Sequence, residues 1–183
     1  MSTPCENNKS VEIKQAFLSS AIADIATYIQ LADTKVSIIM GSLVALGAGI
    51  MSCYQPINDA FAKIPPCSWS GVGLLILLVL LTLSVCGVFI FGILTICGHV
   101  SIIDNKSKWF IATSRSKYSF DAYKKDVVDM TDEDIIDNMA AELYKLNDIN
   151  RQKAGTCKWT IWLFAVTLVL VLAVAVLLHL AAK

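Results

Sequence analysis

From Trp159 to Ala182 the chain reads WTIWLFAVTLVLVLAVAVLLHLAA, without a charged residue. A bilayer core about 30 Å thick is crossed by roughly 20 apolar helical residues, because only a helix satisfies its own backbone amides there. Two further stretches, Val36 to Asn58 and Ile64 to Ile103, also lack charged residues. The sequence therefore predicts three membrane-spanning helices, at 36–53, 72–98 and 159–181.

The composition agrees with an integral membrane protein. Hydrophobic residues make up 56% of the chain and charged residues 16%, and the mean hydropathy is +0.63. The 15 Lys and Arg residues balance the 15 Asp and Glu residues, so no positive field calls for a nucleic acid polymer as partner. The lipid bilayer is the expected partner.

The basic residues predict the orientation, because cytoplasmic loops are enriched in Lys and Arg. The connection 54–71 carries only Lys63, whereas 99–158 carries most of the lysines and arginines. Lys9, Lys14 and Lys35 precede the first span. We therefore expect the N-terminus and the long second loop in the cytoplasm and the C-terminus outside. No cleaved targeting peptide is evident.

Two amphipathic helices are predicted to lead into spans. Residues 1–9 are polar and are expected to form a mobile tail, after which Leu18, Ile22, Ile25 and Ile29 recur at helical spacing. Nothing between Val11 and Met51 breaks a helix, so 10–53 is predicted as one cytoplasmic helix continuous with the first span.

The second amphipathic helix is predicted over 131–158, leading into the third span. Thr131-Asp132-Glu133-Asp134 supplies a capping hydroxyl and three carboxylates for its positive end. The connection 54–71 is expected to be a short extracytoplasmic loop, and 99–130 a cytoplasmic loop with a short helix. The fold class is thus all-α integral membrane. Its cytoplasmic helices bury their apolar stripes in a helical bundle, within one chain or between protomers.

Small residues and cysteines mark two further features. Gly41, Ala45 and Gly49 recur every four residues, a pattern that favours close helix packing, either within the chain or in a homo-oligomer. Cys53 and Cys67 are both expected outside, where an oxidising compartment allows a disulfide. The alternative is that they act as small apolar residues at the ends of spans.

No catalytic constellation or metal-ligand spacing is present, so neither an enzyme nor a metal site is expected. The most unusual element is Ala32-Asp33-Thr34-Lys35, placed directly before the first span. It is either an interfacial anchor or part of a polar site. Asn150, Arg151 and Lys153 lie at a similar distance before the third span, so parallel helices would bring both sets to one level.

Tyr28-Ile29-Gln30-Leu31-Ala32-Asp33-Thr34-Lys35 running into a glycine-bearing span resembles the signature of the Pycsar effector transmembrane family. The aromatic stretch from Phe110 to Tyr123 and the acid-capped helix ending in Asn150-Arg151-Gln152-Lys153 agree with this resemblance in order and spacing. The family serves bacterial anti-phage defence. A cognate pyrimidine cyclase makes cyclic CMP or cyclic UMP on infection, and the effector compromises the inner membrane, which causes abortive infection.

The resemblance implies a ligand-gated membrane switch with no bound cofactor other than the activating cyclic pyrimidine nucleotide. Its implied sensing or coupling residues are Asp33, Lys35, Asn150, Arg151 and Lys153. A pyrimidine base has stacking partners in Tyr118, Phe120 or Tyr123, although ordinary packing is the simpler role for these rings.

Two other function classes remain open on the sequence. One is a membrane scaffold that binds a partner without ligand gating. The other is a holin-like toxin that acts without a ligand. Expression with and without a cyclase separates both from a gated effector.

Overall fold

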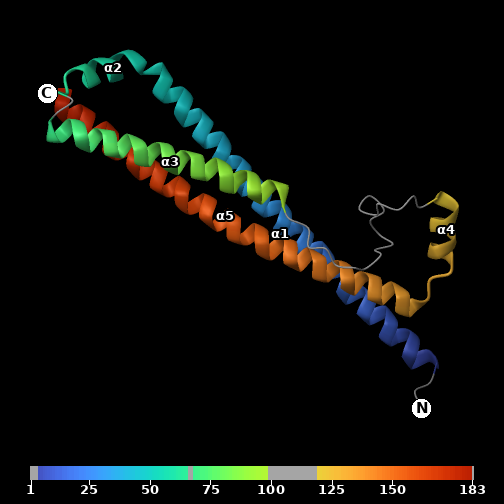
Figure 1. Ribbon diagram of the computed structural model, residues 1–183. Helices are drawn as coiled ribbons and strands as arrows, with labels where there is room; N and C mark the ends of the chain where they lie inside the picture. Colours follow the sequence, from blue (N-terminus) through green and yellow to red (C-terminus); the bar gives the residue numbers. More distant parts are fainter. Residues whose placement is uncertain (1–3, 66–67, 99–118, 183) are drawn as a thin grey trace. The chain divides into compact units, whose positions relative to one another are not determined.

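The computed structural model describes residues 4–65, 68–98 and 119–182, and most of these are helical. The helices are α1 (Pro4–Ser52), α2 (Tyr54–Ala62), α3 (Trp69–Cys97), α4 (Phe120–Val128) and α5 (Asp132–Ala182) (Figure 1). Three of them, α1, α3 and α5, are long and apolar enough to cross a membrane. The predicted all-α fold with three spans is confirmed.

The chain divides into two compact units. We call Met1–Gln30 with His99–Gln152 the polar unit, and Leu31–Gly98 with Lys153–Lys183 the spanning unit. Both α1 and α5 run through the boundary without a break in the helix.

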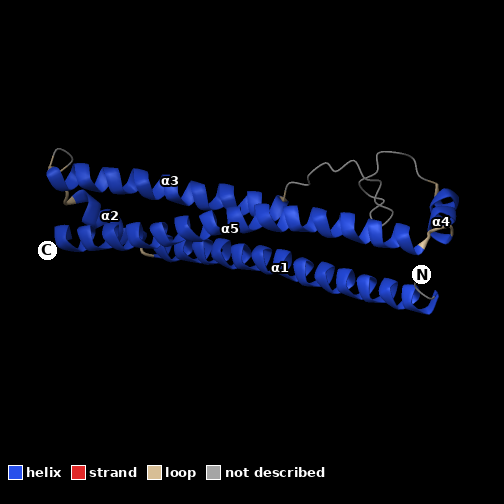
Figure 2. Ribbon diagram, turned by 90° about the horizontal axis from the view of Figure 1, so that it is seen from below, coloured by secondary structure: helices blue, strands red, loops and turns tan. Residues whose placement is uncertain are grey.

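In the polar unit the predicted apolar stripes are partly covered. On α1 Leu18, Ile22, Ile25 and Ile29 are half-buried, and on α5 the positions Ile135, Met139, Leu143, Leu146 and Ile149 are half-buried too. Ile13 and Phe17, which flank the stripe of α1, are exposed. The first part of α1 runs beside the first part of α5 in both views (Figures 1 and 2), as expected for two amphipathic helices that share an apolar seam.

The start of α5 is closed by a reciprocal cap. The Asp134 amide donates to Thr131 Oγ1 at 3.2 Å, and the Thr131 amide donates to Asp134 Oδ2 at 3.0 Å. Two donors that the helix leaves without a partner are satisfied in this way.

A Thr131→Ala substitution is expected to fray the first turn of α5. Loss of a capping hydroxyl costs about 1 kcal/mol, so amide hydrogen exchange over the first turn should accelerate about fivefold. Thr27→Ala is the matched control, because the Thr27 hydroxyl donates only to the Ala23 carbonyl of its own helix at 2.9 Å. Unchanged exchange in Thr131→Ala would contradict the role of the cap.

In the spanning unit, α3 lies along α5 (Figures 1 and 2), and α1 packs against α3 through Val36 and Met40. The buried apolar side chains are Val36 and Leu43 on α1, Leu74 and Val88 on α3, and Cys157 and Leu178 on α5. The rings of Phe91 and Trp159 stack with centroids 6.2 Å apart. Large apolar side chains on the outer faces are exposed, as a helix surrounded by lipid requires, for example Leu83, Ile90 and Leu172.

Close helix approach occurs at glycines of α3, not at the small residues predicted on α1. A Cβ at Gly92 would lie 3.0 Å from Met40 Sδ, so this glycine lets α1 approach α3. At Gly41 or Gly49 a Cβ would have nothing within 4 Å, and Ala45 is exposed. Within one chain the predicted packing through this face is therefore not met, because the helix turns Val36, Met40 and Leu43 inward instead. Packing of the face between subunits stays a prediction.

Two boundaries differ from those expected. Helix α1 begins at Pro4, so residues 4–9 are helical where a mobile tail was expected. The connection 54–71 contains α2, whose Ile57, Ala60 and Phe61 are half-buried on one side. Its polar residues face the other way, so the short loop that we expected contains an amphipathic helix.

Candidate functional site

The spanning unit is held at one end by an ion pair between α1 and α5. Lys153 Nζ donates to both carboxylate oxygens of Asp33, at 2.6 Å and 2.7 Å. The Lys153 side chain is 8% exposed and that of Asp33 is 36% exposed. The ammonium is thus nearly excluded from solvent, whereas its carboxylate partner keeps access to it.

Helical periodicity explains why these two side chains meet. Asp33 lies one turn before Val36 and two turns before Met40, so it continues the face of α1 that packs inward. Lys153 lies one turn before Thr156 and Cys157 on the buried face of α5. The specific element Ala32-Asp33-Thr34-Lys35 therefore places its acid inward and its base, Lys35, at the exposed surface.

Helix α3 ends against this ion pair. Gly98 caps α3 with a φ of +54°, a conformation that glycine adopts without strain, and its amide donates to the Leu94 carbonyl. A Cβ at Gly98 would lie 3.2 Å from Cε of Lys153. A larger residue would be strained there and would press on the lysine stem.

A hydroxyl bridge links α3 to α5 beside the lysine. The Thr95 hydroxyl donates to Thr156 Oγ1 at 2.8 Å, and the Thr156 hydroxyl donates to the Lys153 carbonyl at 3.1 Å. Thr95 is fully buried. Together with the ion pair, this bridge brings polar groups from α1, α3 and α5 to one level of the spanning unit.

This arrangement can respond to charge. A nearly buried ammonium is stable only with a partner, and removal of that partner leaves an unpaired charge in a poorly hydrated place. By contrast, the pairs Lys145–Glu142 at 4.0 Å and Arg151–Asp148 at 2.9 Å join residues one turn apart on α5. Those pairs stabilise a single helix, whereas Asp33–Lys153 joins two helices.

The other predicted site residues do not take part in the Asp33–Lys153 ion pair. Asn150 is half-buried and Arg151 is exposed, and both belong to the polar unit. Phe120 is exposed at the start of α4 and Tyr123 is half-buried within it. Tyr118 lies outside the described residues.

The predicted disulfide stays a prediction. Cys53 is exposed directly after α1, and Cys67 lies outside the described residues. Among the described residues, no group of three His, Cys, Asp or Glu side chains is arranged to hold a metal ion.

Three residues of the site were missed by sequence reasoning: Thr95, Thr156 and Gly98. A glycine directly after a long apolar run is a recognisable helix stop, so Gly98 had a signal. The threonines had none, because a hydroxyl in a span commonly bonds to its own helix. Only the register of α3 on α5 shows that these two bond to each other.

The comparisons with known proteins agree with this architecture. A family model described as the Pycsar effector protein domain matches residues 17–180. The matched range contains Asp33, Lys153 and all of α3. No curated protein and no solved structure matches the chain. The family model covers most of the length of the chain. The chain therefore belongs to the Pycsar effector family and is a membrane protein with a role in Pycsar anti-phage defence.

Proposed function

We propose that this protein is a ligand-gated effector that compromises the bacterial inner membrane when it binds cyclic CMP or cyclic UMP. The nucleotide comes from a cognate pyrimidine cyclase. Loss of membrane integrity then stops the growth of the infected cell before the phage matures. The N-terminus and the polar unit face the cytoplasm, where the nucleotide is made, and the C-terminus lies outside.

The Asp33–Lys153 ion pair is the observation that carries this proposal. The phosphate of a cyclic nucleotide is an anion and can replace the Asp33 carboxylate as the partner of the Lys153 ammonium. The exchange keeps the ammonium paired and releases α1 from α5. A ligand that binds better to the released arrangement shifts the population towards it.

The rest of the site has proposed roles in the same event. In the spanning unit, Lys35 adds positive charge beside the ion pair. In the polar unit, Asn150 and Arg151 are proposed as coupling residues and the rings of Phe120 and Tyr123 as stacking surfaces for a base. Because α1 and α5 are continuous through both units, a change at the ligand reaches the spans directly. A homo-oligomer and the absence of enzymatic activity stay predictions.

Binding of labelled cyclic CMP and cyclic UMP to the purified full-length protein tests the site. Lys153→Met should weaken binding about 10- to 100-fold, the value of a lost charged hydrogen bond. Lys158→Met is the matched control, since Lys158 is exposed on the same helix. Equal affinity in both variants would remove Lys153 from the ligand site.

Depolarisation of the membrane in living cells separates the three function classes. A gated effector should depolarise the membrane only when the cyclase product is present. Depolarisation on expression of the protein alone would indicate a ligand-independent toxin. Intact membranes with the product present would indicate a scaffold and contradict the proposal.

A further inference from the structure

The interior of the spanning unit contains hydroxyl groups where a simple apolar core would be expected. Thr95, Thr160 and Thr167 are fully buried, and Ser84 is nearly so. With Thr156 they form a line that we call the hydroxyl seam. On α5, Thr156 follows Lys153 by three residues, Thr160 follows Thr156 by four, and Thr167 follows Thr160 by seven. At these spacings they share one face of the helix.

The hydroxyl seam joins α3 to α5 at two levels. At the first, Thr95 donates to Thr156 beside the ion pair. At the second, the hydroxyls of Ser84 and Thr167 lie 2.8 Å apart, and both reach the Leu163 carbonyl, at 3.1 Å and 2.8 Å. Thr160 lies between these levels and donates to the Thr156 carbonyl at 3.0 Å.

The seam is long enough to matter for permeation. At 1.5 Å per residue, the axial distance from Lys153 to Thr167 is about 21 Å, of which about 12 Å, from Trp159 to Thr167, lies in the predicted span and covers about two fifths of a bilayer core of about 30 Å. Most of these hydroxyls also bond to a carbonyl of their own helix. They therefore keep a partner when the helices part, and water can replace the interhelical contacts.

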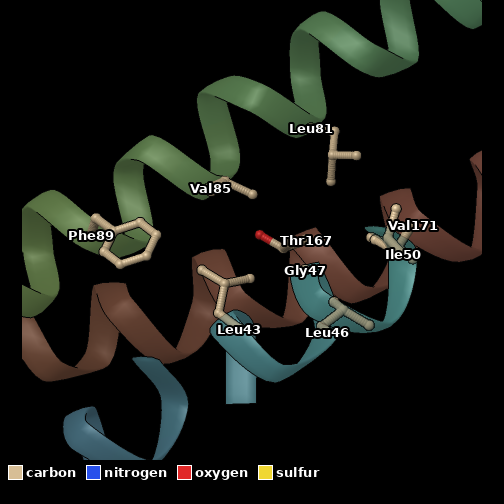
Figure 3. Close-up of a pocket in the computed structure, with 9 residues that line it drawn as sticks. All are labelled: Leu43, Leu46, Gly47, Ile50, Leu81, Val85, Phe89, Thr167 and Val171. Atoms are coloured by element: carbon tan, nitrogen blue, oxygen red, sulfur yellow. The ribbon is translucent and has the colours of Figure 1, made fainter. Parts of the chain in front are cut away.

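An apolar cavity continues the seam. It holds about 260 Å³ and is lined by Thr167 together with Leu43 and Leu46 of α1, Val85 and Phe89 of α3, and Val171 of α5 (Figure 3). Such apolar walls offer water few hydrogen-bond partners. Beyond it the buried residues are apolar, Leu74 and Leu178. A dry apolar segment in series with a polar one is how hydrophobic gates close a pore.

We infer that the hydroxyl seam is the route by which water and small monovalent ions cross the membrane when the effector is active. Release of Asp33 from Lys153 frees α1 at the charged end of the seam, and outward movement of α1 widens the cavity until it wets. Helix α3 then parts from α5 along the seam. The trigger of this opening, binding of the cyclic nucleotide, rests on the proposed function. It replaces a general disruption of lipid with a narrow, defined path.

Ion flux in proteoliposomes tests the route. Vesicles containing the full-length protein are assayed for K⁺ efflux and for release of calcein, a much larger solute. Opening is triggered with cyclic CMP or cyclic UMP, and independently with Asp33→Asn, which leaves Lys153 without its carboxylate. K⁺ should pass at least about tenfold faster than calcein, because the path is narrow. Calcein release as fast as K⁺ efflux would overturn the inference.

Two variants distinguish a pore lining from ordinary packing. Thr160→Val should lower K⁺ efflux about tenfold by making the seam harder to wet. Thr82→Val is the matched control, since the Thr82 hydroxyl is exposed and bonds only to the Leu78 carbonyl of its own helix, at 2.9 Å. Equal efflux in both variants would overturn the inference.

A second measurement tests the route even if Thr160→Val does not fold. All proteins in this assay carry Cys157→Ala, because the free thiol of Cys157 is buried on the same face of α5. A small thiol reagent should then block K⁺ efflux through Thr160→Cys but not through Thr82→Cys or the protein with Thr at both positions. Absence of block would contradict the route. K⁺ efflux through Asp33→Asn without any ligand response would retain the route and reject ligand gating. No efflux under either trigger would overturn the route.

Discussion

Cells that produce Asp33→Asn are expected to lose membrane integrity without any cyclic nucleotide. The substitution leaves the Lys153 ammonium, 8% exposed, without its carboxylate. Breaking a fully buried pair costs about 3–5 kcal/mol, and the 36% exposure of Asp33 lowers this to about 2–3 kcal/mol. The arrangement in which α1 is held to α5 should become about 30- to 150-fold less favourable relative to the released one.

Lys153→Met is expected to behave in the opposite way. Its apolar side chain fills the buried position, and the Asp33 carboxylate that loses its partner is hydrated because it is partly exposed. The variant should therefore remain silent, with or without the nucleotide. Adding Lys153→Met to Asp33→Asn should suppress the ligand-independent toxicity, since no buried charge remains.

Growth and depolarisation measurements on the four proteins complete this double-mutant cycle. Matched expression levels, checked by immunoblot of membrane fractions, exclude a difference in abundance as the cause. Asp33→Asn cells that grow normally and stay polarised would show that the ion pair does not hold the protein in its inactive state.

The three membrane-spanning helices could be predicted from sequence because their cause is local. Charge-free runs such as that from Trp159 to Ala182 have no stable form in water, and a helix is the only form that suits lipid. Asp33 and Lys153 also had a local signal, since each precedes a span by a few residues. Their contact could be anticipated because both lie at the same depth relative to the membrane. The burial of the Lys153 side chain and the partial exposure of Asp33 could not be anticipated.

Packing faces were harder to predict because they depend on the partner. In water an apolar stripe marks the buried side of a helix, whereas in lipid both sides are apolar and the stripe disappears. The glycines of α1 therefore looked like a contact face, while the close approach occurs at Gly92 of α3. The seam threonines were invisible for the same reason, because an inward and an outward threonine look alike in sequence.

Gly92→Val is expected to separate α1 from α3 and to destabilise the spanning unit. A Cβ there already lies 3.0 Å from Met40 Sδ and 3.4 Å from Val36 Cγ1, and valine adds two methyl groups beyond it. Met40 is flexible, but Val36 is fully buried and has no space to move into. Overpacking of this kind costs about 1–3 kcal/mol, which should lower the thermal unfolding midpoint in detergent by several degrees.

Gly41→Val is the matched control, because it makes the same change in the first span where a Cβ has nothing within 4 Å. It should leave the unfolding midpoint of a single chain unchanged. If subunits associate through the face of Gly41, Ala45 and Gly49, it should reduce the oligomer size measured by light scattering, and Gly92→Val should not. Equal midpoints for both variants would mean that Gly92 is not the point of close approach. The comparison therefore separates packing within a chain from packing between chains, which the spacing of small residues alone does not distinguish.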